Sequence, residues 1–199
     1  MISDIFKPAV VRIISPTARG LLRIGLTPNS VTTLGALGVI GTALVAYPSG
    51  HLFGGTVAIC LLALSDLFDG TMARLSQKGA SKWGGFLDST IDRVTDSAIA
   101  LGLLIYLAKK NDDLAFVLIV SIVAGFLVSY IRAKAESLQI ECRGGFAERT
   151  ERLIILLTAI GFTGLGVEYI LTIGIWFLAI ASVVTVIQRL RIVWKATKE

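Results

Sequence analysis

The chain has 199 residues, of which 54% are hydrophobic and 17% are charged, and its formal net charge is +5. A soluble globular domain carries about a quarter charged residues, so this composition excludes an ordinary soluble domain and indicates an integral membrane protein. In such a protein Lys and Arg gather in cytoplasmic loops and meet anionic lipid headgroups, which accounts for the positive charge. We therefore expect membrane lipids, and no nucleic acid, as partners.

The N-terminal segment, residues 1–24, is too charged to cross a membrane. Apolar and basic positions alternate through residues 3–23, and Pro8 and Pro16 interrupt the pattern. This pattern is typical of an amphipathic helix that lies in the membrane interface. Docking of the same helix against the membrane spans from the cytoplasmic side is an alternative that the pattern does not separate from it.

Six apolar stretches follow a turn at residues 25–30. A transmembrane helix needs about 20 mainly apolar residues, and every stretch qualifies except the fifth, which is shorter and interrupted by glycine. The stretches cover approximately residues 30–47, 52–73, 86–108, 114–131, 153–167 and 170–188. The sequence thus predicts an all-α integral membrane protein with six transmembrane helices preceded by the N-terminal amphipathic helix. We expect a single domain over residues 1–199, with the six-helix bundle at 29–195.

The distribution of cations predicts the side on which each connection lies. Lys and Arg are frequent in the N-terminal segment, in the connections after the second and fourth stretches, and in the C-terminal tail. On the opposite side stand only Lys109 and Lys110, and Arg93 lies inside the third stretch. Because cytoplasmic loops carry the excess of Lys and Arg, we expect a multi-pass protein of the cell membrane with both termini and the active site cytoplasmic.

Four carboxylates stand beside long apolar runs, between positions 66 and 92. Residues three or four positions apart share one face of a helix, so Asp66 and Asp69 form one pair and Asp88 and Asp92 form another. Two such faces that meet at the cytoplasmic end would form an oxygen-rich site for one or two hard divalent cations. The sequence therefore predicts a metal site.

Pairing with arginine would account for only some of these acids. An intramembrane Asp often pairs with an Arg, but Arg74 and Arg93 together do not neutralise four carboxylates. Asp96, one turn beyond Asp92, is expected to accept a hydrogen bond rather than to bind a cation. An ion-coupled transporter also carries intramembrane acids, but its path needs polar groups through the midplane, whereas these acids cluster at one face.

The acidic residues form part of a longer pattern. It reads Asp66-x-x-Asp69-Gly70-x-x-Ala73-Arg74, then nine residues, then Gly84-x-x-x-Asp88-x-x-x-Asp92. The pattern resembles the signature of the CDP-alcohol phosphotransferase family, whose members are six-span membrane enzymes, usually homodimers. They transfer a phosphatidyl or related group from a CDP-alcohol to a second alcohol and release CMP.

The resemblance implies the residues of a donor site. Two Mg²⁺ ions, with Mn²⁺ as an alternative, would be held by Asp66, Asp69, Asp88 and Asp92, and Asp92 would also be the general base. Such metals can clamp a pyrophosphate, and a nearby carboxylate can accept the proton of the attacking hydroxyl. The residues implied to bind CDP-diacylglycerol are Asn29, Ser30, Val31, Thr32, Asp66, Asp69, Gly70, Ala73, Arg74 and Ser81.

A second, basic group lies at the predicted cytoplasmic helix ends. Its members are Arg132, Lys134, Arg149, Arg152 and Arg189. Positive-inside bias alone places cations there. Arg149 and Arg152 are stronger evidence for a phosphate site, because a helix N-terminus disfavours cations yet binds anions. Glu148 and Glu151 beside them would partner these arginines or fix their orientation. We expect these cations to bind the phosphate of the acceptor.

The acceptor is suggested by a wider resemblance. Residues 16–28, 129–136, 144–153 and 188–190 are similar to the actinobacterial members of the family that make phosphatidylinositol phosphate, which implies myo-inositol phosphate as the acceptor. The order of Arg132 and Lys134 departs from that pattern, and Thr150 stands where Pro is usual, so the role of each cation stays open. A sister enzyme that takes glycerol 3-phosphate and makes phosphatidylglycerophosphate also needs a phosphate pocket, so charge alone does not exclude it.

Overall fold

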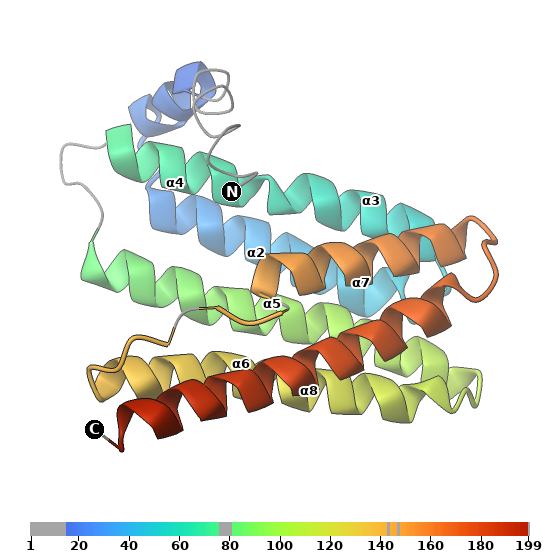
Figure 1. Cartoon of the computed structure of the whole chain (residues 1–199). Coiled ribbons are helices and arrows are strands. Elements are labelled where there is room, and N and C mark those ends of the chain that lie inside the picture. The colour runs from blue at the N-terminus through green and yellow to red at the C-terminus, as the bar shows by residue number, and fades with distance from the viewer. Residues whose placement is uncertain (1–14, 76–80, 143, 147, 199) are drawn as a thin grey trace. The chain divides into compact units, whose positions relative to one another are not determined.

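The structure, a computed structural model, describes residues 15–75, 81–142, 144–146 and 148–198 (Figure 1). Throughout these ranges the regular structure is helical and no strand is present, which confirms the all-α prediction. The helices are α2 (Pro28–Ala46), α3 (Leu52–Ala63), α4 (Ser65–Leu75), α5 (Lys82–Lys109), α6 (Leu114–Ser137), α7 (Arg149–Gly164) and α8 (Ile170–Ala196). Residues 15–23 are also helical. Most of the predicted amphipathic segment, residues 1–14, lies outside the described residues.

Each of the six apolar stretches corresponds to helix, but the second is not one helix. α3 ends at Ala63 and α4 begins at Ser65. At the break the Leu64 amide donates to the Leu61 carbonyl at 3.3 Å. This hydrogen bond spans three residues instead of the four of an α-helix, so the chain turns more tightly here. Ser and Asp are favoured residue types at helix starts, so the pair Ser65 and Asp66 suits the position at which α4 begins.

Three of the described helices are long and apolar enough to cross a membrane: α2, α6 and α8. α3 is apolar but has 12 residues, and α7 has 16. α5 has 28 residues, but charged side chains occupy its first half. The chain is therefore a membrane protein by length and composition, and the six-span count stays a prediction.

The chain forms two compact units. The first comprises residues 1–45 and 57–99, and the second comprises residues 46–56 and 100–199. All four carboxylates of the acidic pattern fall in the first unit, and all five cations of the basic group fall in the second.

In the first unit, glycines of α2 allow close approach of the chain around the α3–α4 break. The helical spacing of Gly35, Gly38 and Gly41 predicts such an approach. A side chain at Gly35 would overlap Ser65, and one at Gly38 would lie 3.0 Å from Leu62. At Gly41 a Cβ would meet no described atom within 4 Å. Gly35 and Gly38 therefore lie against side chains next to the α3–α4 break, and Gly35 packs beside the residue that precedes Asp66.

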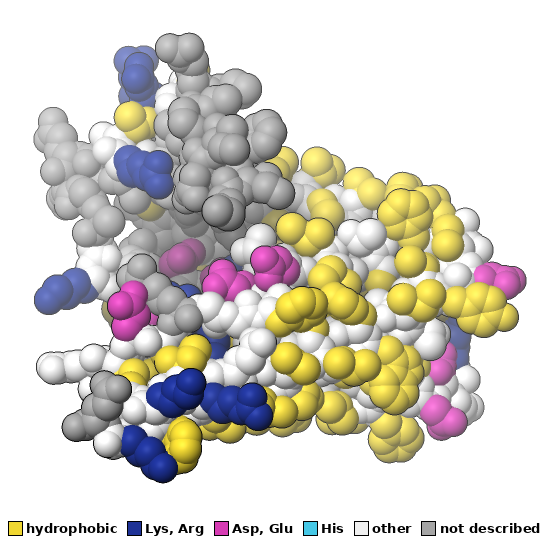
Figure 2. Space-filling view, viewed as in Figure 1, with side chains coloured by type: hydrophobic (Ala, Val, Ile, Leu, Met, Phe, Trp, Pro, Cys, Tyr) yellow, Lys and Arg dark blue, Asp and Glu magenta, His cyan; other side chains and the backbone are white. Residues whose placement is uncertain are grey.

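The second unit is built on α8. Both α6 and α7 pack against it; α6 runs in the same direction as α8, and α7 runs opposite (Figure 1). Its core includes Leu118 of α6, Ile160 of α7, and Ile175 of α8, each at most 1% exposed. Lys and Arg side chains gather over the end of α8 near the C-terminus, whereas apolar side chains cover most of the remaining α7 and α8 surface (Figure 2). A basic end and an apolar middle are what a membrane-spanning bundle needs.

Candidate active site

The acidic pattern lies on two helices of the first unit. Asp66 and Asp69 belong to α4, and Asp88 and Asp92 belong to α5. Asp88 is exposed, and Asp92 is half-buried and has an interaction partner. The side chains of Asp66 and Asp69 lie outside those that the structure describes. Among the described side chains no group of three acidic, Cys or His residues forms a metal cluster, so the meeting of the four carboxylates stays a prediction.

The donor set nevertheless suits the expected ions. Spacings of three and four residues, now on observed helices, put each pair of carboxylates on one face. Carboxylate oxygens are the ligands that hard divalent cations prefer. Gly70 is exposed, and a Cβ there would meet no described atom within 4 Å. No described side chain therefore packs against α4 at this glycine.

The starts of α2 and α5 converge in the same unit. The Ser81 hydroxyl accepts a hydrogen bond from the Gly84 amide at 2.9 Å and so caps α5. A Cβ at Gly84 would lie 3.4 Å from Asn29 Oδ1. Asn29 and Ser81, both predicted to bind the nucleotide, are therefore close to one another around a glycine of the pattern.

The hydroxyls at the start of α2 already have local partners. Ser30 forms two hydrogen bonds with Thr27. The Ser30 amide donates to Thr27 Oγ1 at 3.2 Å, and the two side-chain hydroxyls bond to each other at 2.8 Å. Thr32 donates to the Pro28 carbonyl at 3.0 Å and is buried. Val31 is half-buried. Within the predicted segment 29–32, the Asn29 side chain lies beside Gly84 of α5.

The arginines of the acidic region have different surroundings. Arg74 is exposed in the last turn of α4. Arg93 forms an ion pair with Asp96, with 3.8 Å between Nη1 and Oδ2. At 3.8 Å this contact is an ion pair and not a hydrogen bond, so the acceptor role expected of Asp96 stays a prediction. This pairing engages Arg93 with an acid outside the four-carboxylate pattern.

In the second unit, the cations at the end of α6 are exposed. Arg132 Nε donates to Glu136 Oε1 at 3.0 Å, a pair one helical turn apart. Lys134 is also exposed. Sequence reasoning missed Glu136, although the Arg–Glu spacing of four residues is the signal that predicts such a pair. Glu136 therefore competes with any acceptor phosphate for Arg132.

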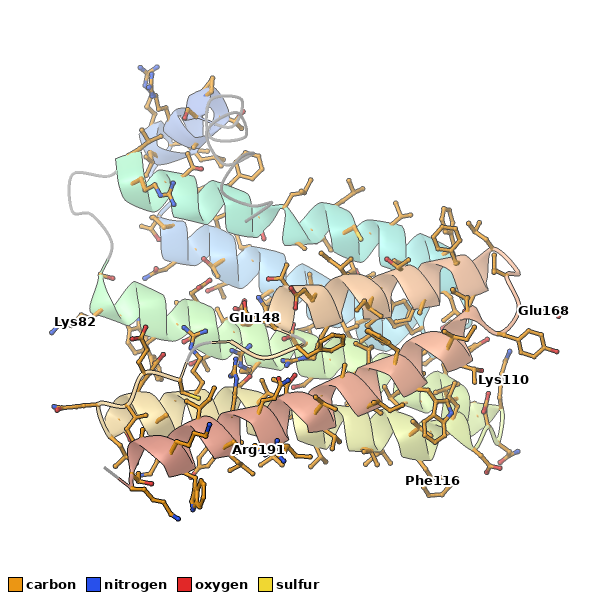
Figure 3. All side chains as sticks on the ribbon, in the orientation of Figure 1. Lys82, Lys110, Phe116, Glu148, Glu168 and Arg191 are labelled. Carbon is orange, nitrogen blue, oxygen red and sulfur yellow. The ribbon has the colours of Figure 1, made fainter. Side chains whose placement is uncertain are left out.

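The start of α7 is capped by two glutamates. The Glu148 amide donates to Glu151 Oε2 at 2.8 Å, and the two residues form a capping box. Figure 3 places Glu148 at the first turn of α7. These carboxylates already offset part of the positive end of the helix dipole. Phosphate binding here would therefore depend on the Arg149 and Arg152 guanidinium groups more than on bare helix N–H groups.

Arg152 reaches across to α6. A Cβ at Gly125 would lie 3.7 Å from Arg152 Nε and 3.9 Å from its Cζ, so the guanidinium rests on the glycine face of α6. Arg149 and Arg152 are both half-buried, and both have interaction partners. No periodic signal in the sequence singles out Gly125 as the place where this side chain lies.

Arg189 is the buried member of the basic group, with 3% of its surface exposed. Its Nε donates to the Gly144 carbonyl at 3.1 Å, and its Nη1 donates to the Val128 carbonyl at 2.6 Å. The guanidinium of α8 thus joins α6 to the connection that leads into α7. The other predicted cations lie on the elements that meet at this residue, because Arg132 follows Val128 by one turn and Arg149 follows the connection.

The fold and both groups of residues define a class: an all-helical membrane protein with a four-carboxylate pattern and a basic cluster. The sequence model of the CDP-alcohol phosphatidyltransferase family matches residues 25–187, and the chain belongs to this family of transferases.

Particular relatives are similar over nearly the whole chain. The phosphatidylinositol phosphate synthase of Mycobacterium tuberculosis is 42% identical over 193 residues, which cover 94% of this chain and 88% of the relative. The phosphatidylinositol phosphate synthase of Streptomyces avermitilis is 42% identical over 208 residues, which cover 100% of this chain and 85% of the relative. A crystal structure of the M. tuberculosis enzyme with CDP-DAG bound has a TM-score of 0.88 at 42% identity, covering 92% of this chain and 94% of the other. A second crystal structure of that enzyme, in complex with manganese and citrate, has a TM-score of 0.85 at 41% identity and covers 91% of this chain and 88% of the other.

Proposed function

We propose that the protein transfers the phosphatidyl group of CDP-diacylglycerol to myo-inositol phosphate and releases CMP. The observation that carries the proposal is the complete eight-position pattern on α4 and α5, in a chain that is 42% identical to synthases of phosphatidylinositol phosphate. The bound CDP-DAG of the similar crystal structure supports the donor. The attacking hydroxyl displaces CMP at the phosphorus that carries the diacylglycerol.

Asp66, Asp69, Asp88 and Asp92 hold divalent cations in this proposal. Two Mg²⁺ ions are the expected set, and Mn²⁺ is an alternative that the manganese complex of a similar protein supports. When bound, the cations offset the negative charge of the pyrophosphate. The chain's own contribution is to hold the donor: Asn29, Ser81 and the glycine face of α4 surround the nucleotide, and Arg74 binds phosphate.

Asp92 accepts the proton of the attacking hydroxyl. It is half-buried on α5, one turn beyond the exposed Asp88 and on the same face. A carboxylate within hydrogen-bond reach of the attacking hydroxyl can accept its proton. The neighbouring Arg93 forms its ion pair with Asp96, which is not a member of the four-carboxylate pattern.

The acceptor phosphate binds to the basic cluster, Arg132, Lys134, Arg149, Arg152 and Arg189. Arg132 and Lys134 are exposed, whereas Arg189 is anchored through Nε and Nη1. An arginine held by two main-chain carbonyls presents its remaining donors in a fixed direction, and fixed donors bind a phosphate with less loss of side-chain entropy. The cluster lies at the basic end of the second unit, which supports a cytoplasmic active site in the cell membrane.

The experiment is a CMP-release assay with the purified protein, Mg²⁺ and CDP-diacylglycerol. Addition of myo-inositol phosphate is expected to release CMP and form phosphatidylinositol phosphate. Release with glycerol 3-phosphate alone would reassign the acceptor and make the protein a phosphatidylglycerophosphate synthase. Absence of CMP with every acceptor would overturn the transferase assignment.

A further inference from the structure

The connection between α6 and α7 is fixed to one face of α8. We call residues 140–148 the strap; Arg143 and Ala147 within it lie outside the described residues. The strap begins where α6 is closed by a bond from the Ile140 amide to the Ala135 carbonyl, 3.0 Å. It ends at Glu148, which caps α7. Cys142 within it is 1% exposed and so is packed against its neighbours, whereas Gly145 and Phe146 are exposed.

Four residues of α8 hold the strap: Phe177, Thr185, Gln188 and Arg189. They recur at spacings that place them on one side of the helix. The Gln188 side-chain carbonyl accepts a bond from the Phe146 amide at 3.1 Å. The Phe146 ring packs on Phe177, with 6.1 Å between centroids. Arg189 donates to the Gly144 carbonyl. The main chain of the strap is therefore bonded to α8 at two points, the Gly144 carbonyl and the Phe146 amide.

Gly145 is the point of closest approach. A Cβ there would overlap the Cγ2 methyl of Thr185, a fully buried side chain. The φ angle of Gly145 is +138°, which L side chains rarely adopt. Its neighbour Gly144 has a similar positive φ, +99°, but a Cβ there would meet no described atom within 4 Å. The two glycines thus share a backbone requirement and differ in steric contact with α8.

We propose that this strap is a positioning device for the acceptor site: its docking on α8 through Gly145 and Gln188 sets the place of Arg149 and Arg152. Phe146 precedes Glu148, the N-cap of α7, by two positions in the sequence, so displacement of the docked main chain is expected to shift the first turn of α7. Arg152 in turn rests on Gly125 of α6, and a shift of that turn moves it along α6. Gln188, Thr185 and Gly145 act through the strap and touch no substrate. The inference rests on the proposed transferase function and deepens it.

The test compares two alanine variants in the CMP-release assay. Gly145→Ala forces the strap away from Thr185, and is expected to raise the KM for inositol phosphate about ten-fold or more, because small displacements of binding groups weaken binding strongly. The kcat and the KM for CDP-diacylglycerol change by less than about two-fold, since the donor residues lie in the other unit. Gly144→Ala introduces backbone strain without the contact, and is expected to raise the acceptor KM by less than about a third as much as Gly145→Ala.

A rescue variant separates positioning from general damage. Thr185→Ser removes the Cγ2 methyl but keeps the hydroxyl that donates to the Ala181 carbonyl at 2.7 Å. The double variant Gly145→Ala/Thr185→Ser is expected to recover most of the acceptor KM. Equal effects of the two alanine variants, an equal rise in both KM values, or no recovery in the double variant would each overturn the proposal.

A second position keeps the test independent of folding of the glycine variant. Gln188→Leu has nearly the same shape but no acceptor for the Phe146 amide, and should raise the acceptor KM about five-fold, the effect of one neutral hydrogen bond. An unchanged acceptor KM would overturn the strap's role even if Gly145→Ala does not fold. Wild-type protein without CMP release on any acceptor would overturn the proposed function itself, whereas an active wild type with insensitive variants would overturn the strap alone.

Discussion

Replacement of Arg189 tests whether one buried side chain joins the elements of the second unit. Its Nε and Nη1 donate to the carbonyls of Gly144 and Val128 at 3.1 and 2.6 Å, and 3% of the residue is exposed. Arg189→Met keeps much of the volume and removes both bonds. Arg189→Lys keeps the charge, but a single ammonium group lacks the fork that spans two carbonyls.

The magnitude follows from the two bonds. A hydrogen bond from a charged group contributes about 1.5–3 kcal/mol, so Arg189→Met should lower the free energy of unfolding by about 3–5 kcal/mol and Arg189→Lys by about 2 kcal/mol. Loss of the bond to the Gly144 carbonyl should cost more than loss of the bond to the Val128 carbonyl, because Val128 lies in a helix where the main chain also supplies a donor. For a chain of this size each kcal/mol lowers Tm by about 2–4 °C, so the methionine variant should melt roughly 10 °C lower.

The assay is thermal unfolding of the purified protein in detergent micelles. Arg191→Met is the matched control, because Arg191 lies two residues further on α8 and is exposed (Figure 3); its Tm should stay within about 2 °C of the wild type. Equal Tm values for the Arg189 and Arg191 variants would refute the structural role of the buried guanidinium.

Four further predictions concern the first unit, the base and the acceptor cluster. Gly35→Ala should destabilise the protein by about 1–3 kcal/mol through overlap with Ser65, whereas Gly41→Ala should be nearly neutral; equal Tm shifts would contradict the packing. Asp92→Asn should abolish CMP release while CDP-diacylglycerol still binds, and an active variant would remove the general-base assignment. Arg152→Gln should raise the acceptor KM at least about ten-fold, and much more than the donor KM, and equal rises would argue against a dedicated phosphate pocket. Chelation by EDTA should stop turnover and added Mg²⁺ should restore it; turnover in EDTA would contradict the metal requirement.

Local patterns in the sequence predict most of the helices. Hydrophobic runs locate α2, α5, α6, α7 and α8, and the spacing of the acidic residues places each pair on one helix face. The run 52–73 is not a single helix, because α3 ends at Ala63 and α4 begins at Ser65, a boundary that average hydropathy does not mark.

The basic cluster is predicted from residue type and position, but its internal contacts are not. Glu148 and Glu151 have the spacing of a capping box. The sequence is therefore equally compatible with these bonds at the start of α7 and with pairing of the glutamates to the arginines. The contacts of Arg189 with residues 45 and 61 positions away depend on how α6, α8 and the connection after α6 pack together, and no local pattern encodes them. The role of Gln188 is hidden from the sequence for the same reason.

The most direct test of the central claim is the acceptor dependence of CMP release by the wild-type protein with Mg²⁺ and CDP-diacylglycerol. The account predicts release with myo-inositol phosphate and far less with glycerol 3-phosphate or with free inositol, which lacks the phosphate that the basic cluster binds. Equal release with inositol and inositol phosphate would contradict the phosphate pocket, and release with glycerol 3-phosphate alone would contradict the assigned reaction.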